Sequence, residues 1–284
     1  MGGSTLKLAT MLAAALVAAV LTTAALGAAG TKSVALPVID VTMDGSSISV
    51  NGTLESGAVD VHTVATGQGS GTPILVRLND GVTANQFLAF LNSKKAGDPN
   101  NVTPYGSIVF DAEAGPGTND IQTILQPGDY VAFDGGKDNP AQWPNTTFTI
   151  SENLSPASLP AMTQWQKSIE FRFRGPGTLH VGQVIRVSNV GWVVHMMDGF
   201  GVKNKAMGRE AIQLLRSGQD RKLNKLLGPG TEFFSFFGPV SHGAVQQFVL
   251  QAKPGWYVEA CFMDTQDGRE HTRLGMERLI HIVR

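Results

Sequence analysis

The chain of 284 residues contains one cysteine, Cys261, which has no partner for an intrachain disulfide. In an oxidising compartment a lone thiol would need an explanation. One explanation is that Cys261 is buried and packs as a small apolar residue, as free cysteines frequently do. The other is that its thiolate is protected because it is bound to something.

The residues that follow and precede Cys261 occur in a characteristic order. A loop of nine residues, 262–270, separates Cys261 from His271, and Met276 follows with four residues between them and a glycine directly before it. Upstream, the strand-like segment 187–195 ends in a second histidine. This order resembles the cupredoxins, Greek-key β-sandwiches in which a strand delivers a cysteine, the next loop a histidine and a methionine, and an earlier strand another histidine. The His-x4-Met spacing is similar to that of plastocyanin and nitrite reductase.

The resemblance implies one mononuclear copper site. His195, Cys261 and His271 would be the equatorial ligands, and Met276 would be the axial ligand. Such a set suits copper in its two oxidation states because it combines soft thiolate and thioether with imidazole. A rigid sandwich would hold that geometry with little change, and coordination would explain the lone cysteine.

A closer resemblance is to a group of uncharacterised bacterial exported cupredoxin-like proteins that share the loop order Cys-Phe, Asp-Gly, His, Gly-Met. For that group the resemblance implies a fold and a site but no established activity. The loop is longer than in plastocyanin-like members and more polar, which would allow His271 to face away. Each ligand candidate also has a purely structural explanation, as a core histidine, an apolar thiol or a core methionine. The remaining histidines, which we predict to be structural, are His62, His180, His242 and His281.

The composition favours a fold with many turns and few long helices. Apolar residues make up 42% of the chain and charged residues 16%, with 33 glycines and 14 prolines. Coiled coils and disordered tails are therefore not expected. Lysine plus arginine number 22 against 23 for aspartate plus glutamate, without a basic cluster. We therefore predict no nucleic-acid partner.

Alternating apolar residues in short runs between Gly and Pro turns predict antiparallel β-sandwiches. The Gly-Thr-Leu-x-x-Gly motif at 52–57 recurs at 177–182, and Pro-Gly-x-Tyr-Val at 127–131 recurs at 254–258. Two ordered matches at a nearly constant offset indicate a duplication. With the resemblance, we predict an all-β fold of two tandem cupredoxin-like Greek-key β-sandwiches. Each would carry a helical insertion, at 83–93 and 204–227, where apolar residues repeat every three to four positions.

The predicted domains follow from the repeat. Residues 33–136 would form a degenerate cupredoxin-like domain, 137–160 a linker with an entering strand, and 161–284 the domain with the copper site. Aligning the Pro-Gly-x-Tyr-Val motifs places Asp134 opposite Cys261, and no His-x4-Met follows Asp134. We therefore predict that the first copy has no metal site and serves packing or partner contact.

Residues 1–29 have the pattern of an export signal, with Lys7 followed by an apolar run and then small residues. The alternative is a retained membrane anchor, because 8–30 is an uncharged run of 23 residues. We predict an exported protein that is periplasmic, extracellular or on the cell surface. It would contact a membrane only if the N-terminal segment were not cleaved.

Together these features predict an exported mononuclear copper-binding protein that transfers single electrons to an unknown redox partner protein or holds copper. No independent catalysis is expected, since the chain has no His-x-His pair for a trinuclear oxygen-reducing centre. The alternative is a metal-free structural or ligand-binding β-sandwich at the cell surface. Solvent-facing side chains at His271 and Met276 would favour that alternative.

Overall fold

A computed structural model of the chain describes residues 35–66, 71–112, 117–135 and 139–284. The predicted signal or anchor at 1–29 lies outside these residues. Within them, no helix has the length and apolar character needed to span a membrane.

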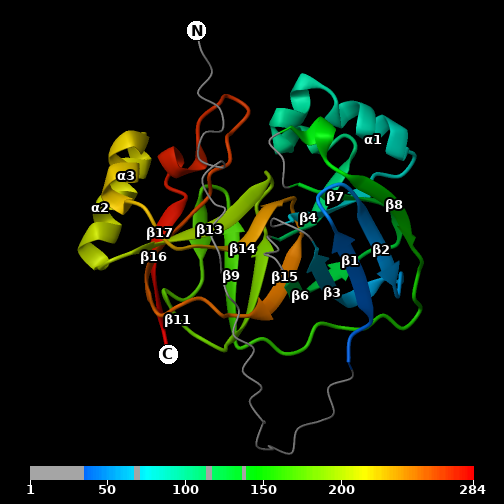
Figure 1. Cartoon of the computed structure of the whole chain (residues 1–284), viewed down its shortest axis with the longest axis horizontal. Coiled ribbons are helices and arrows are strands. Elements are labelled where there is room, and N and C mark those ends of the chain that lie inside the picture. The colour runs from blue at the N-terminus through cyan, green and yellow to red at the C-terminus, as the bar shows by residue number, and fades with distance from the viewer. Residues whose placement is uncertain (1–34, 67–70, 113–116, 136–138) are drawn as a thin grey trace, which may run out of the picture.

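The first half consists mainly of short strands in two sheets (Figure 1). Its strands are β1 (Val38–Met43), β2 (Ile48–Gly52), β3 (Gly57–Ala65), β4 (Pro73–Leu78), β5 (Gly106–Asp111), β6 (Gly117–Leu125), β7 (Gly128–Asp134) and β8 (Asn145–Ile150). In β1 the apolar residues Ile39, Val41 and Met43 alternate into the core, as the two-residue period of a strand requires. The strand orders are β6-β3-β1-β2 in one sheet and β5-β4-β7-β8 in the other.

The second half repeats this strand order. Its strands are β9 (Gln164–Ile169), β10 (Arg172–Arg174), β11 (Thr178–His180), β12 (Val184–Asn189), β13 (His195–Val202), β14 (Phe233–Val240), β15 (Val245–Val249), β16 (Gly255–Ala260) and β17 (Glu277–Val283). They form the orders β15-β12-β9-β10 and β14-β13-β16-β17, with β11 added beyond β17. The all-β prediction is therefore confirmed, and the two halves share one topology.

The sheets are mixed, whereas the sequence predicted antiparallel pairing throughout. β1 pairs parallel with β3, β9 with β12, and β11 with β17. The first two of these pairs follow from the hairpin at the start of each half, in which β2 folds back on β1 and β10 on β9. The next long strand, β3 or β12, then lies on the free side of the first strand and runs in the same direction.

The predicted linker, 137–160, contains a strand that belongs to the first half. β8 pairs antiparallel with β7, from Gly128 opposite Ile150 to Phe133 opposite Asn145. Beyond it, Ser151 N–H still donates to the Leu54 carbonyl at 3.0 Å.

Helices occupy both predicted insertions. α1 (Ala84–Leu91) begins after Thr83, which forms a capping box with Gln86. The 3-10 turns η1 (Lys94–Gly97) and η2 (Pro99–Val102) follow it. In the second half α2 (Lys205–Arg216) and α3 (Asp220–Leu227) lie on the outer side of the molecule (Figure 1), with Leu215 and Leu223 packed into a cluster with Val258. Two further 3-10 turns are η3 (Pro140–Gln142) and η4 (His271–Leu274).

The two halves are joined through one continuous sheet. β6 pairs antiparallel with β15, so that Thr123 lies opposite Gln246, and the sheet then runs unbroken through eight strands. Thr123 Oγ1 also donates to the Val245 carbonyl at 2.7 Å, and Asp111 N–H donates to Gln246 Oε1 at 3.2 Å. These two hydrogen bonds connect the halves directly across the junction.

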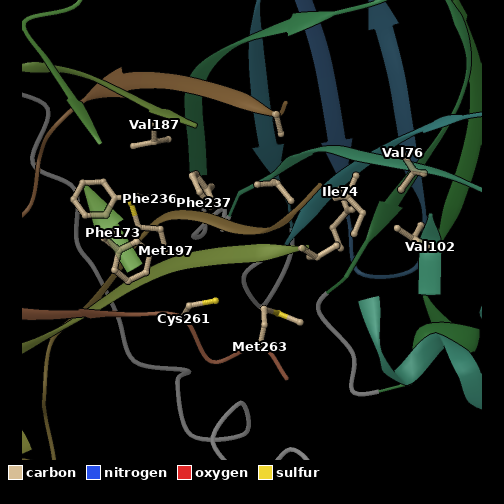
Figure 2. Packing of buried hydrophobic residues seen from close by; sticks show 14 of the residues in the cluster. Ile74, Val76, Val102, Phe173, Val187, Met197, Phe236, Phe237, Cys261 and Met263 are labelled. Atoms are coloured by element: carbon tan, nitrogen blue, oxygen red, sulfur yellow. The ribbon is translucent and has the colours of Figure 1, made fainter. Parts of the chain in front are cut away.

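A single apolar cluster spans the junction as well. Figure 2 shows its side chains continuing from Cys261 and Met263 in the second half to Ile74, Val76 and Val102 in the first. The two halves therefore share an apolar core that includes Cys261.

Candidate metal centre

The topology brings the four candidate ligands to one end of a sheet. β13 and β16 are antiparallel neighbours, so the first residue of β13, His195, lies at the end where β16 delivers Cys261. β17 runs antiparallel to β16 on its other side, so Met276, directly before β17, reaches the same end. His271 begins η4, the turn that leads into Met276.

Three of the four side chains converge on one another. Cys261 Sγ lies 3.2 Å from His271 Nδ1 and 3.8 Å from His195 Nδ1, and the two Nδ1 atoms are 3.2 Å apart. All three residues have no exposed surface. Within the described residues, they form the group of His, Cys, Asp or Glu side chains close enough to share a metal ion.

Met276 lies beside this triangle. The Cys261 N–H donates to the Met276 carbonyl at 3.1 Å, and the Met276 N–H donates to the His271 carbonyl at 3.0 Å. The Met276 side chain is fully buried in the cluster that contains Cys261. Gly275 makes this approach possible because it ends η4 with φ +98°, a left-handed conformation that favours glycine. Neither His271 nor Met276 faces solvent.

The nine-residue loop does not carry His271 away from Cys261, because the loop folds back on itself. Asp264 forms an antiparallel bridge with Glu270, and the His271 N–H donates to the Met263 carbonyl at 2.8 Å. At the tip, Thr265 N–H donates to the Arg269 carbonyl at 2.9 Å. The polar residues of the loop thus form a closed turn that returns the chain to the site.

Burial sets the protonation of the three converging groups. Burial, reinforced by His271, lowers the pKa of His195 to about 3. Burial also lowers the pKa of His271 to about 4, against the opposing charge of Asp98. Burial raises the pKa of the Cys261 thiol to about 12, although the Met196 N–H donates to Sγ at 3.4 Å. At neutral pH without a metal, the site therefore holds two neutral imidazoles and a protonated thiol.

The turn before His195 is built to place its ring. Asn189 holds the turn by donating from Nδ2 to the Val193 and Val240 carbonyls, at 2.9 and 2.8 Å. Gly191 N–H donates to Asn189 Oδ1 at 2.9 Å. A Cβ at Gly191 would lie 2.7 Å from His195 Nε2, so the imidazole packs directly against the glycine backbone.

Sequence reasoning missed three neighbours of the site. Phe171 presents its ring edge-on to His271, with centroids 5.1 Å apart. Gly191 packs under His195, and Asn100 reaches the site from the first half. No sequence signal marks them, because each acts only through the tertiary arrangement. The nearest hint was the Gly-Trp pair within the segment that ends at His195.

The other histidines have structural partners, as predicted. His62 bonds to Asp120, His180 to the Arg284 carbonyl, His242 to the Gly191 carbonyl, and His281 stacks on Trp256. In the first half, Asp134 lies opposite Pro73 at the corresponding sheet end, and Thr72 N–H donates to Asp134 Oδ1 at 3.2 Å. That end carries a hydrogen-bonded carboxylate where the second half has Cys261.

Comparisons with known proteins gave no family assignment. No protein-family model and no curated protein matches the chain. Among solved structures, auracyanin B is 15% identical with a TM-score of 0.25 and covers 44% of this chain and 91% of its own. A Cu-containing nitrite reductase from Thermus scotoductus SA-01 is 12% identical with a TM-score of 0.24 and covers 86% of this chain and 67% of its own. An azurin from Methylomonas sp. strain J is 11% identical with a TM-score of 0.23 and covers 42% and 95%. At such TM-scores these likenesses do not assign a function, so the case for the site rests on its own residues.

The histidine pKa values predict an acid-sensitive metal-free protein. Between pH 6.5 and about 4 the unfolded chain takes up protons on His195 and His271 while the folded chain does not. The free energy of unfolding therefore decreases as the pH falls. Between pH 7 and 5 each histidine should cost on the order of 1–2 kcal/mol of unfolding free energy. Denaturant titrations of the metal-free protein at both pH values should show a shallower decline for His195→Gln. An equal decline in both proteins would contradict the assigned burial.

Proposed function

We propose that the chain is a mononuclear copper protein that transfers single electrons, and that His195, Cys261, His271 and Met276 would hold the ion. The observation that supports the proposal is the convergence of two imidazole Nδ1 atoms and one thiol Sγ in the buried interior. When bound, copper would supply a one-electron couple between its two oxidation states.

The spacing of the donors fits a metal ion. An ion about 2.1 Å from each of three donors holds them about 3.4–3.6 Å apart, for tetrahedral and trigonal arrangements respectively. The three separations in this structure are 3.2, 3.2 and 3.8 Å. Small side-chain adjustments would therefore suffice for binding, so the protein offers a preformed site.

The types of donor favour copper over other ions. Two histidines, a cysteine thiolate and a methionine thioether form the set associated with blue-copper electron transfer. Zinc sites combine cysteine, histidine and carboxylate ligands, and thioether is not among them. The apolar cover around Cys261 and Met276 would keep water from the thiolate.

Complete burial of the ligands favours electron transfer over catalysis on a bound substrate. Cys261, His271 and His195 have no exposed surface, so no substrate could reach an ion between them without displacing protein. An electron can reach the ion through the protein, without an opening for a substrate. The protein's own residues would hold the imidazoles neutral, accept the ion after the thiol loses its proton, and keep the donors fixed during electron exchange.

We extend this proposal to an exported protein, on the basis of the signal-like residues 1–29, with a redox partner protein of unknown identity. Copper holding would use the same ligands and stands as the second candidate. A metal-free sandwich is the other alternative, and it would have to keep two imidazoles and a thiol together in the buried interior with no ion between them.

Copper addition tests the proposal. Cu(II) added to the purified protein should produce an intense thiolate-to-copper absorption band near about 600 nm. Cys261→Ser and His195→Gln should lose that band, whereas His281→Gln should keep it, because His281 stacks on Trp256 away from the ligands. A wild-type protein without the band, or a Cys261→Ser variant that retains stoichiometric copper, would refute the site.

Gly191→Ala should weaken copper binding without a change in any ligand. The new Cβ would lie 2.7 Å from His195 Nε2 and 2.9 Å from Glu170 Oε1, so the imidazole must shift. Loss of such support around a ligand is expected to reduce metal affinity about ten-fold or more. The matched control is Gly177→Ala, where no atom lies within 4 Å of the added Cβ. Equal copper affinities in the two variants, measured by competition with a chelator, would show that Gly191 does not position His195.

A further inference from the structure

At the sheet end that corresponds to the site, the first half has Asp134 where the second half has Cys261, but one turn of the first half reaches the site of the second half. η2 (Pro99–Val102) follows the first-half helix α1 and η1. Its residue Asn100 is 94 positions before Val194 and 164 before Asp264, yet bonds to both. These hydrogen bonds are separate from the pairing of β6 with β15.

The Asn100 side chain bonds to two backbone segments that carry ligands. Asn100 Oδ1 accepts from the Val194 N–H at 2.9 Å, and Val194 directly precedes His195. Asn100 Nδ2 donates to the Asp264 carbonyl at 3.1 Å, in the loop between Cys261 and His271. One amide thus connects the start of β13 to the ligand loop. Since both bonds are to main-chain atoms, they fix the backbone positions from which the ligands project.

Asp98 fixes the orientation of this amide. Asp98 Oδ1 accepts from the Asn100 backbone N–H at 2.9 Å and from Asn100 Nδ2 at 3.0 Å. The two Nδ2 hydrogens are therefore used by Asp98 and the Asp264 carbonyl, which leaves Oδ1 facing Val194. Pro99 follows Asp98 at the first position of η2, and its ring fixes the φ angle at the start of this turn. The amide is held before any metal binds.

We infer that Asn100 is a positioning residue for the metal centre, and that the first half serves the second as a rigid support which fixes the His195 strand relative to the Cys261–His271 loop. Electron transfer needs ligands that stay in place in both oxidation states. The two hydrogen bonds from Asn100 in the first half to backbone atoms of the second half provide that constraint. The inference rests on the proposed function for the identity of the ion. The two Asn100 hydrogen bonds themselves are formed in the protein without metal.

The experiment compares Asn100→Leu and Asn100→Asp with the matched control Asn101→Leu in the full chain. Asn101 lies in the same turn, but its Nδ2 donates to the Lys95 carbonyl at 2.9 Å within the first half. Leu at position 100 removes both bonds. Asp keeps an acceptor for Val194 and loses the donor to Asp264. Thermal unfolding midpoints identify variants that fail to fold.

In the metal-free proteins, Asn100→Leu should speed hydrogen exchange at the Val194 amide about five-fold or more relative to wild type, as expected for one lost hydrogen bond. Asn100→Asp should speed that exchange as well, because its carboxylate would face the Asp98 carboxylate in place of the Nδ2 donor that orients the side chain. In the copper-loaded proteins, both substitutions at 100 should shift the absorption band and the reduction potential, whereas Asn101→Leu should change neither. These spectroscopic readouts separate positioning from a general loss of stability.

Unchanged Val194 exchange, band and potential in a folded Asn100→Leu protein would overturn the inference. Equal changes in Asn101→Leu would overturn it too, because the effect would then belong to the turn and not to the amide. If wild-type protein takes up no copper, the proposed function fails. The Val194 exchange in metal-free protein still decides whether Asn100 ties the two segments.

Discussion

The close approach of three polar atoms inside an apolar core constrains the rest of this structure. Cys261 Sγ and the Nδ1 atoms of His195 and His271 lie within 3.8 Å of one another, and burial keeps the imidazoles neutral and the thiol protonated. Such a grouping is costly in a core unless something compensates the donors and acceptors. A soft metal ion would do so, at the expense of one thiol proton. The surrounding fold must therefore fix the three groups and keep water out.

The sheet topology fixes the three groups, and the apolar core shared by the two halves keeps water out. Antiparallel pairing of β13 with β16 and of β16 with β17 places the ligand-bearing strand ends together. The shared apolar cluster continues from Cys261 and Met263 to side chains of the first half (Figure 2). With Asn100 the first half also contacts the ligand-bearing backbone directly. The first half, which has Asp134 where the second half has Cys261, thus contributes to the surroundings of the site.

Much of the fold could be predicted from the sequence because it depends on local patterns. Alternation, repeated turn motifs and apolar helix spacing predicted the all-β class and the insertions at 83–93 and 204–227. The candidate ligands were predicted from the resemblance of their residue order to that of the cupredoxins. The parallel strand pairs were missed because alternation does not reveal a strand's direction. Asn100 and Gly191 were missed because their roles depend on neighbours distant in sequence or on close backbone approach, which one sequence does not display.

The central claim is that one copper ion is bound by two imidazoles and a single thiolate. X-ray absorption at the copper edge of the loaded protein tests it most directly, since the fine structure distinguishes sulfur from nitrogen or oxygen neighbours. The account predicts one short copper–sulfur contact from Cys261 and two nitrogen neighbours from His195 and His271, with the sulfur contact absent in Cys261→Ser. A first shell made only of nitrogen and oxygen in the wild-type protein would contradict it.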